Sequence, residues 1–156
     1  MRKKYYCLAL VFFIFGAVTG CSGDVDVAWH TDSALFDENP ENFFAISVFG
    51  KDGEAIIERL FIEYRENISV ADLTAKSGRI KNIPVVFAGM GVMRYVRGIN
   101  NLFEFDHGAG SGWLYAINGE FMGIGSGNFI VAPGDSLSWH YTLDLGADLG
   151  ANIGNN

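Results

Sequence analysis

The alternation of apolar and polar positions predicts a β-hairpin at the start of a folded unit. Residues 43–50, FFAISVFG, are rich in aromatic and β-branched side chains, and a second apolar run, EAIIERLFIEY, occupies residues 54–64. The intervening GKDG is a turn sequence, because glycine and aspartate tolerate the backbone conformations that tight turns need. Two strands joined by a short loop are therefore expected.

A short helix is predicted after this hairpin, within the segment NISVADLTAKSG. Ser69 precedes the first apolar position and Asp72 follows three residues later, which is the arrangement of a capping box. Gly78 predicts the end of the helix, since glycine enters the left-handed conformation at low cost. The apolar side of the helix, which carries Val70 and Leu73, is expected to lie on the sheet.

The rest of the apolar pattern predicts further strands. IPVVFAGMGVMRYVRGI is typical of two strands interrupted near residues 89–91, while GWLYAING and DSLSWHYTLD alternate with the period of two that a strand shows. In the last segment one face is expected to be buried, and it carries Leu137, Trp139, Tyr141 and Leu143. A hairpin, one helix and several antiparallel strands predict an α+β fold of the β-grasp type, with a mostly antiparallel sheet and one short helix.

The N-terminus carries the pattern of a secretory signal. A basic start, MRKK, is followed by an apolar run over residues 5–18 and then by Val-Thr-Gly-Cys, which ends at Cys21. The apolar run is shorter than the ~20 residues that a membrane span needs. The pattern resembles bacterial lipoproteins, in which the cysteine receives a diacylglycerol. We therefore expect a signal peptide over residues 1–20, lipidation of Cys21 and a place on the extracytoplasmic face of the cell membrane. The alternatives are a chance cysteine after an ordinary signal and an uncleaved anchor helix.

Composition and charge restrict the partners of the remaining chain. The full sequence has 18 acidic and 11 basic residues, a net charge of −7, and the basic residues of MRKK lie in the predicted signal. A surface this acidic repels phosphate backbones and anionic lipid head groups, so nucleic acid is not an expected partner. Cys7 also lies in the signal, so no disulfide is expected in the mature chain.

The length and the apolar pattern together predict one folded domain. Residues 21–42 mix acidic, small and polar residues, as a flexible tether does, and the folded domain is expected over residues 43–149. The end of the chain, residues 150–156, is rich in glycine and asparagine and is expected to be a flexible tail.

Three blocks of the sequence carry a family resemblance. They are NISVADLTAKSG at the predicted helix, YVRGINNLFEFDHGAGSGWLYAINGE in the middle and FIVAPGDSLSWHYTLDLGADLG at the close. Through them, residues 45–149 resemble the transcobalamin-like C-terminal domain family, also called domain of unknown function 4430. The resemblance implies a soluble-ligand-binding β-grasp fold, found in bacterial surface lipoproteins and as the smaller domain of animal cobalamin carriers. In those carriers cobalamin lies between this domain and a large helical domain. This chain has no room for that helical domain, so a separate partner could supply the second wall.

The resemblance also implies where a ligand would be contacted. Trp113 and Tyr115 match the aromatic positions on the ligand-facing hairpin of the carriers. Tyr95 matches the turn before that hairpin, and loop 121–125 matches the segment that covers the ligand. The implied ligand-binding residues are Tyr95, Trp113, Tyr115, Phe121, Met122 and Ile124.

The residues themselves leave two readings of these side chains open. Trp113 and Tyr115 share one face of a strand, and if that face meets the helix they belong to the core. Phe121, Met122 and Ile124 are flanked by glycines and are expected to form an adaptable apolar tip. Exposed apolar clusters commonly mark binding sites, so this tip is a candidate contact surface.

No arrangement of reactive side chains predicts catalysis. His30, His107 and His140 are far apart in the sequence, and no spacing is typical of a metal site. Asp106 adjoins His107, but neighbouring loop residues commonly point apart. Ser111 lies in a glycine-rich stretch like a nucleophile elbow, yet it leads into a strand, whereas an elbow leads into a helix. We expect no enzyme, no metal and no catalytic cofactor, with cobalamin possible only as a bound ligand.

Two functions remain open from the sequence. The first is a lipid-anchored extracytoplasmic binding module that captures a corrinoid or another small ligand and hands it to an uptake transporter. The second is a cell-surface protein-interaction module, without a small-molecule ligand, in which the same aromatic hairpin docks another protein.

Overall fold

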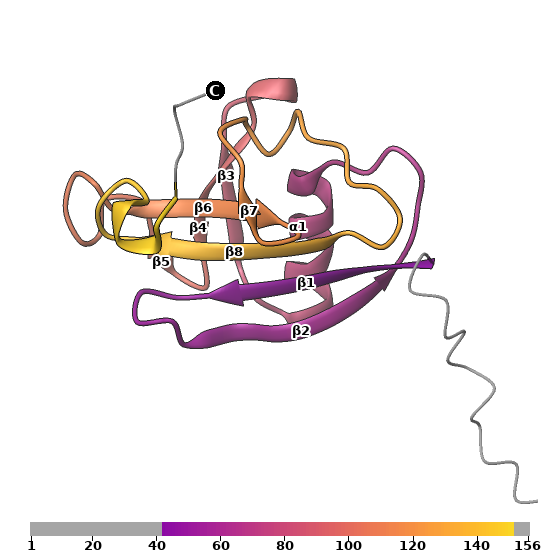
Figure 1. The fold of residues 1–156 in the computed structure, drawn as a ribbon, viewed down its shortest axis with the longest axis horizontal. Helices are drawn as coiled ribbons and strands as arrows, with labels where there is room; N and C mark the ends of the chain where they lie inside the picture. The colour runs from indigo at the N-terminus through magenta and orange to yellow at the C-terminus, as the bar shows by residue number, and fades with distance from the viewer. Residues whose placement is uncertain (1–41, 152–156) are drawn as a thin grey trace, which may run out of the picture. The chain divides into compact units, whose positions relative to one another are not determined.

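The computed structural model describes residues 42–151, whose arrangement is shown in Figure 1. The predicted signal peptide, Cys21, His30 and the tether up to residue 41 lie outside the described residues, as do residues 152–156 of the tail. Within the described range, no helix has the length and apolar character that crossing a membrane requires.

Strands make up most of the regular structure, and one α-helix follows the first hairpin. The strands are β1 (Phe43–Phe49), β2 (Ala55–Glu63), β3 (Val85–Ala88), β4 (Tyr95–Ile99), β5 (Leu102–Phe103), β6 (Gly112–Ile117), β7 (Glu120–Phe121) and β8 (Ser136–Thr142). The helices are α1 (Val70–Lys81) and the short 3-10 turns η3 (Gly91–Met93) and η4 (Ala147–Leu149). The α+β class, with mostly sheet and one α-helix in the described part, is therefore confirmed.

The strands form two sheets. The larger has the order β2-β1-β8-β6-β7, and the smaller has the order β3-β4-β5. Strands β1 and β8 pair in parallel, with Ile46 opposite Leu137, and the other pairs are antiparallel. Figure 1 shows the yellow β8 beside the indigo β1, so the first and last strands are neighbours at the centre of the larger sheet. The parallel pair was not predicted, because the apolar pattern of a strand does not name its partner.

The helix begins where the sequence predicts and ends later. The Ser69 side chain accepts a hydrogen bond from the backbone N–H of Asp72 at 3.1 Å, as an N-cap does. The expected stop at Gly78 is wrong, because the helix continues to Lys81 and Asn82 takes the left-handed conformation at its C-cap, with φ 54°. Gly78 serves another purpose: an added Cβ there would lie 2.6 Å from Cγ2 of Val85. The glycine lets helix α1 approach β3 closely.

The core lies between the larger sheet and the helix. Alternate residues of β1, β6 and β8 point inward, as their burial shows. Trp139 is fully buried, and its indole N–H donates to the Thr74 hydroxyl on the helix at 2.8 Å. Leu137 and Tyr141 are buried as expected, but Leu143 is 41% exposed, so its predicted place in the core is wrong. Strand β8 ends at Thr142, whose hydroxyl accepts from the N–H of Gly146 and turns the chain.

Candidate functional site

A pocket of about 210 Å³ lies where β4, β6 and the loop after β7 meet. Its lining includes Val96 at the side and Trp139 from β8, and no charged residue takes part. Five of the six residues that the resemblance implies also line it: Tyr95, Trp113, Tyr115, Met122 and Ile124. These five residues are spread over positions 95–124 of the sequence, and the structure brings them together around one uncharged hollow, which we call the aromatic pocket.

Two aromatic side chains form the inner wall of the aromatic pocket. Trp113 and Tyr115 are only 9% and 4% exposed. The indole N–H of Trp113 donates to the carbonyl of Leu102 at 2.9 Å, and the Tyr115 hydroxyl donates to the carbonyl of Ile124 at 2.9 Å. The two readings left open by the sequence are therefore compatible, because these residues belong to the core and also line the pocket.

Burial controls the ionisation of the pocket phenol. Tyr115 packs against Trp139, with ring centroids 5.3 Å apart, and loss of hydration raises its pKa to about 12. The phenol therefore remains protonated at neutral pH and can act as a hydrogen-bond donor. Its hydrogen bond to the Ile124 carbonyl holds the loop that lines the pocket.

The loop over the pocket is fixed by its backbone. The N–H of Met122 donates to the Tyr115 carbonyl at 3.0 Å, which continues the β6–β7 hairpin. Further along, the Ser126 hydroxyl and the N–H of Gly127 both donate to the carbonyl of Arg94, at 3.1 and 2.9 Å. An added Cβ at Gly127 would lie 2.2 Å from the Gly91 carbonyl oxygen, so two backbones meet here without room for a side chain.

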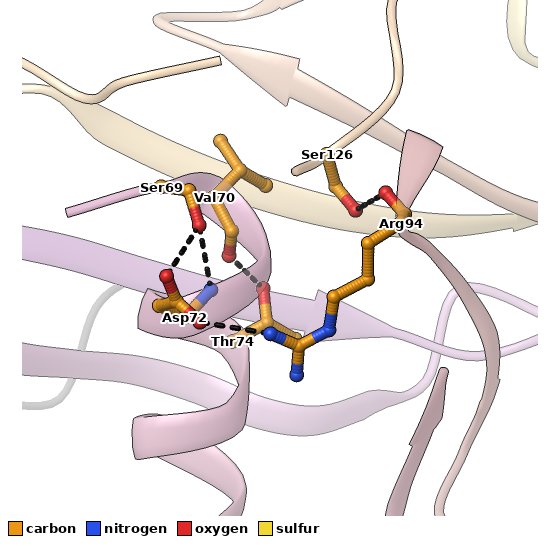
Figure 2. A network of polar contacts seen from close by, with 6 residues as sticks. All are labelled: Ser69, Val70, Asp72, Thr74, Arg94 and Ser126. Atoms are coloured by element: carbon orange, nitrogen blue, oxygen red, sulfur yellow. Dashed lines mark hydrogen bonds and ion pairs between the residues drawn. The ribbon is translucent and has the colours of Figure 1, made fainter. Parts of the chain in front are cut away.

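A polar network connects this loop to the start of the helix, as Figure 2 shows. The Arg94 guanidinium donates to the Asp72 carboxylate at 2.8 Å, and Asp72 in turn accepts from the hydroxyl of Ser69. The same guanidinium lies over the ring of Phe87, 3.9 Å from its centroid. Arg94 therefore connects two parts of the chain: its side chain binds Asp72 at the helix cap, and its backbone carbonyl accepts the hydrogen bond from Ser126. The capping contact between Ser69 and Asp72 was predicted, but the contribution of Arg94 was not, because Asp72 and Arg94 are 22 residues apart.

The exposed rim of the aromatic pocket comes from two loops. Ile124 is 48% exposed, and Tyr95 is 41% exposed at the first residue of β4, not in the turn that the resemblance implies. Met90 and Met93, at turn η3, are 87% and 74% exposed. Turn η3 lies against the loop that carries Ile124: a Cβ added at Gly125 of that loop would be only 3.1 Å from the carbonyl oxygen of Val92. These methionines were not predicted as part of the site, although their segment, like loop 121–125, has apolar residues flanked by glycines.

Phe121 lies apart from this pocket. It pairs with Ala116 of β6 and points to the outer face of the larger sheet, where its ring meets His140 at 5.4 Å. His140 also stacks on Phe49 at 5.1 Å, and burial lowers the pKa of the imidazole. The expectation that Phe121, Met122 and Ile124 form one tip is therefore wrong for Phe121, because neighbouring residues of a strand point to opposite faces.

The remaining reactive side chains are held in structural roles. The Ser111 hydroxyl is buried, donates to the Gly108 carbonyl at 2.9 Å, and accepts from the Tyr141 hydroxyl at 3.0 Å and the His107 N–H at 3.1 Å. These bonds hold the Ser111 hydroxyl within the fold. Across residues 42–151 there is no group of three or more His, Cys, Asp or Glu side chains that could hold a metal ion.

The fold and the pocket define a small α+β domain with an uncharged, largely apolar hollow beside its central sheet. Residues 68–142, about half of the chain, match the model of the family described as Domain of unknown function (DUF4430). The match lies within residues 45–149, where the three sequence blocks predicted a resemblance to this family. No curated protein matches the chain.

Two solved structures are similar to the chain. Haptocorrin in complex with Cbi has 14% sequence identity and a TM-score of 0.51, and the similarity covers 67% of this chain and 26% of haptocorrin. A protein from Ruminococcus gnavus ATCC 29149, described as a candidate metal-binding protein, has 12% identity and a TM-score of 0.47, covering 65% of this chain and 96% of that protein. The similarity to haptocorrin shows a shared fold and supports the transcobalamin-like resemblance. The chain spans about a quarter of haptocorrin.

Proposed function

We propose that this protein is a lipid-anchored, extracytoplasmic binding module of the β-grasp type that holds part of a small ligand in the aromatic pocket. The observation that carries the proposal is the convergence of Tyr95, Trp113, Tyr115, Met122 and Ile124 on one uncharged pocket. The β-grasp assignment is supported by the strand order β2-β1-β8-β6-β7, with a parallel pair at its centre and one helix on the inner face.

A corrinoid is the leading ligand. Haptocorrin, whose structure is described in complex with Cbi, shares the fold, which makes this ligand class the first to test. The aromatic pocket, at about 210 Å³, is smaller than the roughly 300–1,000 Å³ of pockets that enclose a drug-sized ligand. It would therefore accept one edge of a corrinoid, while the rest of the ligand lies against the rim.

The rim suits a large ligand with apolar edges. Ile124 and Tyr95 line the pocket, and the exposed Met90 and Met93 flank turn η3, whose Val92 carbonyl lies close to Gly125 of the pocket loop. Methionine side chains are flexible and polarisable, so they adapt to irregular ligand surfaces. A partner protein, such as an uptake transporter, would cover the opposite side of the ligand. No bond is made or broken in this proposal, so the protein is a carrier and not an enzyme.

The test is an ultraviolet-visible titration of the full chain with cobalamins. We expect a saturable change in the corrin spectrum, and we expect Ile124→Asp to weaken it strongly, because the substitution places a carboxylate at an uncharged rim. The melting temperature of Ile124→Asp serves as the control for folding. A corrin spectrum that does not change with the wild-type chain would reject corrinoids as the ligand.

A second candidate function is docking of another surface protein on the same rim. The observation that favours it is the exposure of Met90, Val92 and Met93, which lie outward of the pocket and not in its lining. In this case Met90→Ser combined with Met93→Ser should abolish capture of a cell-surface protein and leave the corrin titration unchanged. Loss of corrinoid binding in the double variant would instead assign the methionines to the ligand site.

A further inference from the structure

A second hollow, larger than the aromatic pocket, lies between helix α1 and strand β3. It has a volume of about 530 Å³. Its lining includes Ala75, Gly78, Arg79, Val85, Phe87 and Arg94. We call it the α1–β3 groove. It is distinct from the ligand site proposed above, because none of its lining residues lines the aromatic pocket.

One wall of the α1–β3 groove is an open sheet edge. Strand β3 is the outermost strand of the sheet β3-β4-β5. The N–H of Asn100 donates to the carbonyl of Pro84 at 2.9 Å, and hydrogen-bonded and non-bonded pairs alternate along an antiparallel ladder. The N–H and C=O of Val85 therefore point away from β4 and take no part in its ladder. An edge of this kind can accept an added strand, with alternate side chains of that strand entering the adjacent groove.

The other wall gives the groove a positive charge in an acidic protein. Arg79 and Arg94 line the groove, and no Asp or Glu does, although the chain carries a net charge of −7. Arg94 is occupied by Asp72 and by the ring of Phe87. Arg79 is exposed in the last turn of the helix and forms no ion pair among the residues that the structure describes. Its guanidinium is therefore open to a carboxylate from outside.

These features argue against a second copy of the chain as the occupant. Two β3 edges brought together would bring two Arg79 side chains into the same region, and two acidic chains repel each other. An extended acidic segment from a different protein meets both walls better. Its backbone can pair with Val85, its apolar side chains can contact Phe87, and its carboxylate can pair with Arg79.

We propose that the α1–β3 groove binds an extended, acidic segment of a partner protein, which adds a strand to the free edge of β3 and places a carboxylate on Arg79. The groove shares no lining residue with the aromatic pocket, although the carbonyl of Arg94 holds Ser126 of the pocket loop. Arg79, which would bind the partner carboxylate, takes no part in that contact, so we expect a partner to be held while the pocket is filled or empty. The proposal does not depend on the identity of the pocket ligand.

The experiment uses a dye-labelled, capped peptide that alternates threonine and valine around one central glutamate. Its binding to the full chain is followed by fluorescence polarisation, and contacts are located from the backbone amide signals of Val85–Ala88 by NMR. Two further peptides serve as probes of the mechanism: one has glutamine in place of glutamate, and one has methylated backbone nitrogens on the edge that would face β3.

The matched protein variants are Arg79→Glu and Lys81→Glu. Both reverse one charge in the last turn of helix α1, but only Arg79 lines the groove. We expect Arg79→Glu to weaken peptide binding at least tenfold and Lys81→Glu to change it less than twofold. The glutamine peptide should bind more weakly, the methylated peptide should not bind, and the amide signals of β3 should shift.

Four results would overturn the proposal. They are no binding of the glutamate peptide at any attainable concentration, equal weakening by both variants, full binding of the methylated peptide, and dimerisation of the chain through β3 without peptide. The corrin titration, run in parallel on Arg79→Glu, keeps the two sites apart. An unchanged corrin response in that variant is expected, and its loss would contradict the independence of the groove.

Discussion

The floor and the rim of the aromatic pocket are built differently. On the floor, Trp113, Tyr115 and Trp139 are buried, and each makes a hydrogen bond to another part of the chain. On the rim, Ile124 and Met93 expose much of their side chains to solvent. One pocket can therefore separate stability from recognition, because the residues that hold the fold are not the ones exposed to an incoming ligand.

The floor and the rim meet at two points. One is the hydrogen bond from the Tyr115 hydroxyl to the Ile124 carbonyl. The other is Arg94, whose carbonyl holds Ser126 of the loop and whose side chain reaches Asp72 at the helix cap. Substitutions at these points should lower the free energy of unfolding by less than substitutions on the floor and by more than substitutions on the rim.

The largest effect is expected on the floor. Trp139→Ala removes a fully buried indole and leaves the Thr74 hydroxyl without its donor, so the free energy of unfolding should fall by about 3–5 kcal/mol. Chemical denaturation of wild type and variant gives the value. A loss no larger than that of a rim substitution would remove the distinction between floor and rim.

A smaller effect is expected at the helix cap. Ser69→Ala removes the acceptor for the Asp72 N–H and should lower the free energy of unfolding by about 1 kcal/mol. It also frees the carboxylate that holds Arg94, so amide hydrogen exchange in loop 122–127 should become faster. Ser69→Thr keeps a hydroxyl that can both accept from the Asp72 N–H and donate to the Asp72 carboxylate, and it is the control. If Ser69→Ala had the same melting temperature as the wild type, the network in Figure 2 would have no part in stabilising the helix.

The Tyr115 hydroxyl, which links the floor to the rim, should make the free energy of unfolding depend on pH in the alkaline range. The pKa of Tyr115 is raised from 10.0 to about 12 by burial, so the folded state favours the protonated phenol. This contribution to stability is fully present below pH 10.0 and is lost as pH rises toward about 12. Tyr115→Phe cannot ionise, so the free energy of unfolding of the wild type should fall more steeply with pH over this window than that of the variant. Parallel curves would show that the phenol is hydrated in the folded state.

The smallest effect is expected on the rim. Met93→Ser changes an exposed side chain, so the free energy of unfolding should stay within about 0.5 kcal/mol of the wild type. Thermal melts of both proteins measure this. A markedly lower melting temperature would mean that Met93 is packed in the fold and is not available to a ligand.

Much of the fold follows from local patterns in the sequence. The N-cap at Ser69, the hairpin before it and the inward face of β8 depend on neighbouring residues, and these predictions are confirmed. Gly78 misled the prediction because the same residue type suits a helix end and a close contact. Only the position of Val85 in space decides between these two uses.

The candidate site was predictable in part. The resemblance implied six ligand-binding residues, and the structure places five of these six in the lining of one pocket. Phe121 could not be placed, because the short strand β7 fixes which face it takes and its register with β6 is not visible in the sequence. The contribution of Arg94 was also hidden, since its partners Asp72 and Ser126 come from segments that meet only after folding.

The central claim is that ligands enter the aromatic pocket and not the outer face of the sheet. Ile124 and Phe121 test it directly, because both are apolar, three residues apart and at least partly exposed, yet only Ile124 lines the pocket. The measurement is the cobalamin affinity of Ile124→Ala and Phe121→Ala by spectral titration, with melting temperatures taken in parallel. Ile124 lines the pocket, so losing its apolar contact with the ligand should weaken binding by up to roughly tenfold, while Phe121→Ala stays within about twofold of the wild type. Equal losses in the two variants, or a larger loss for Phe121→Ala, would contradict the account.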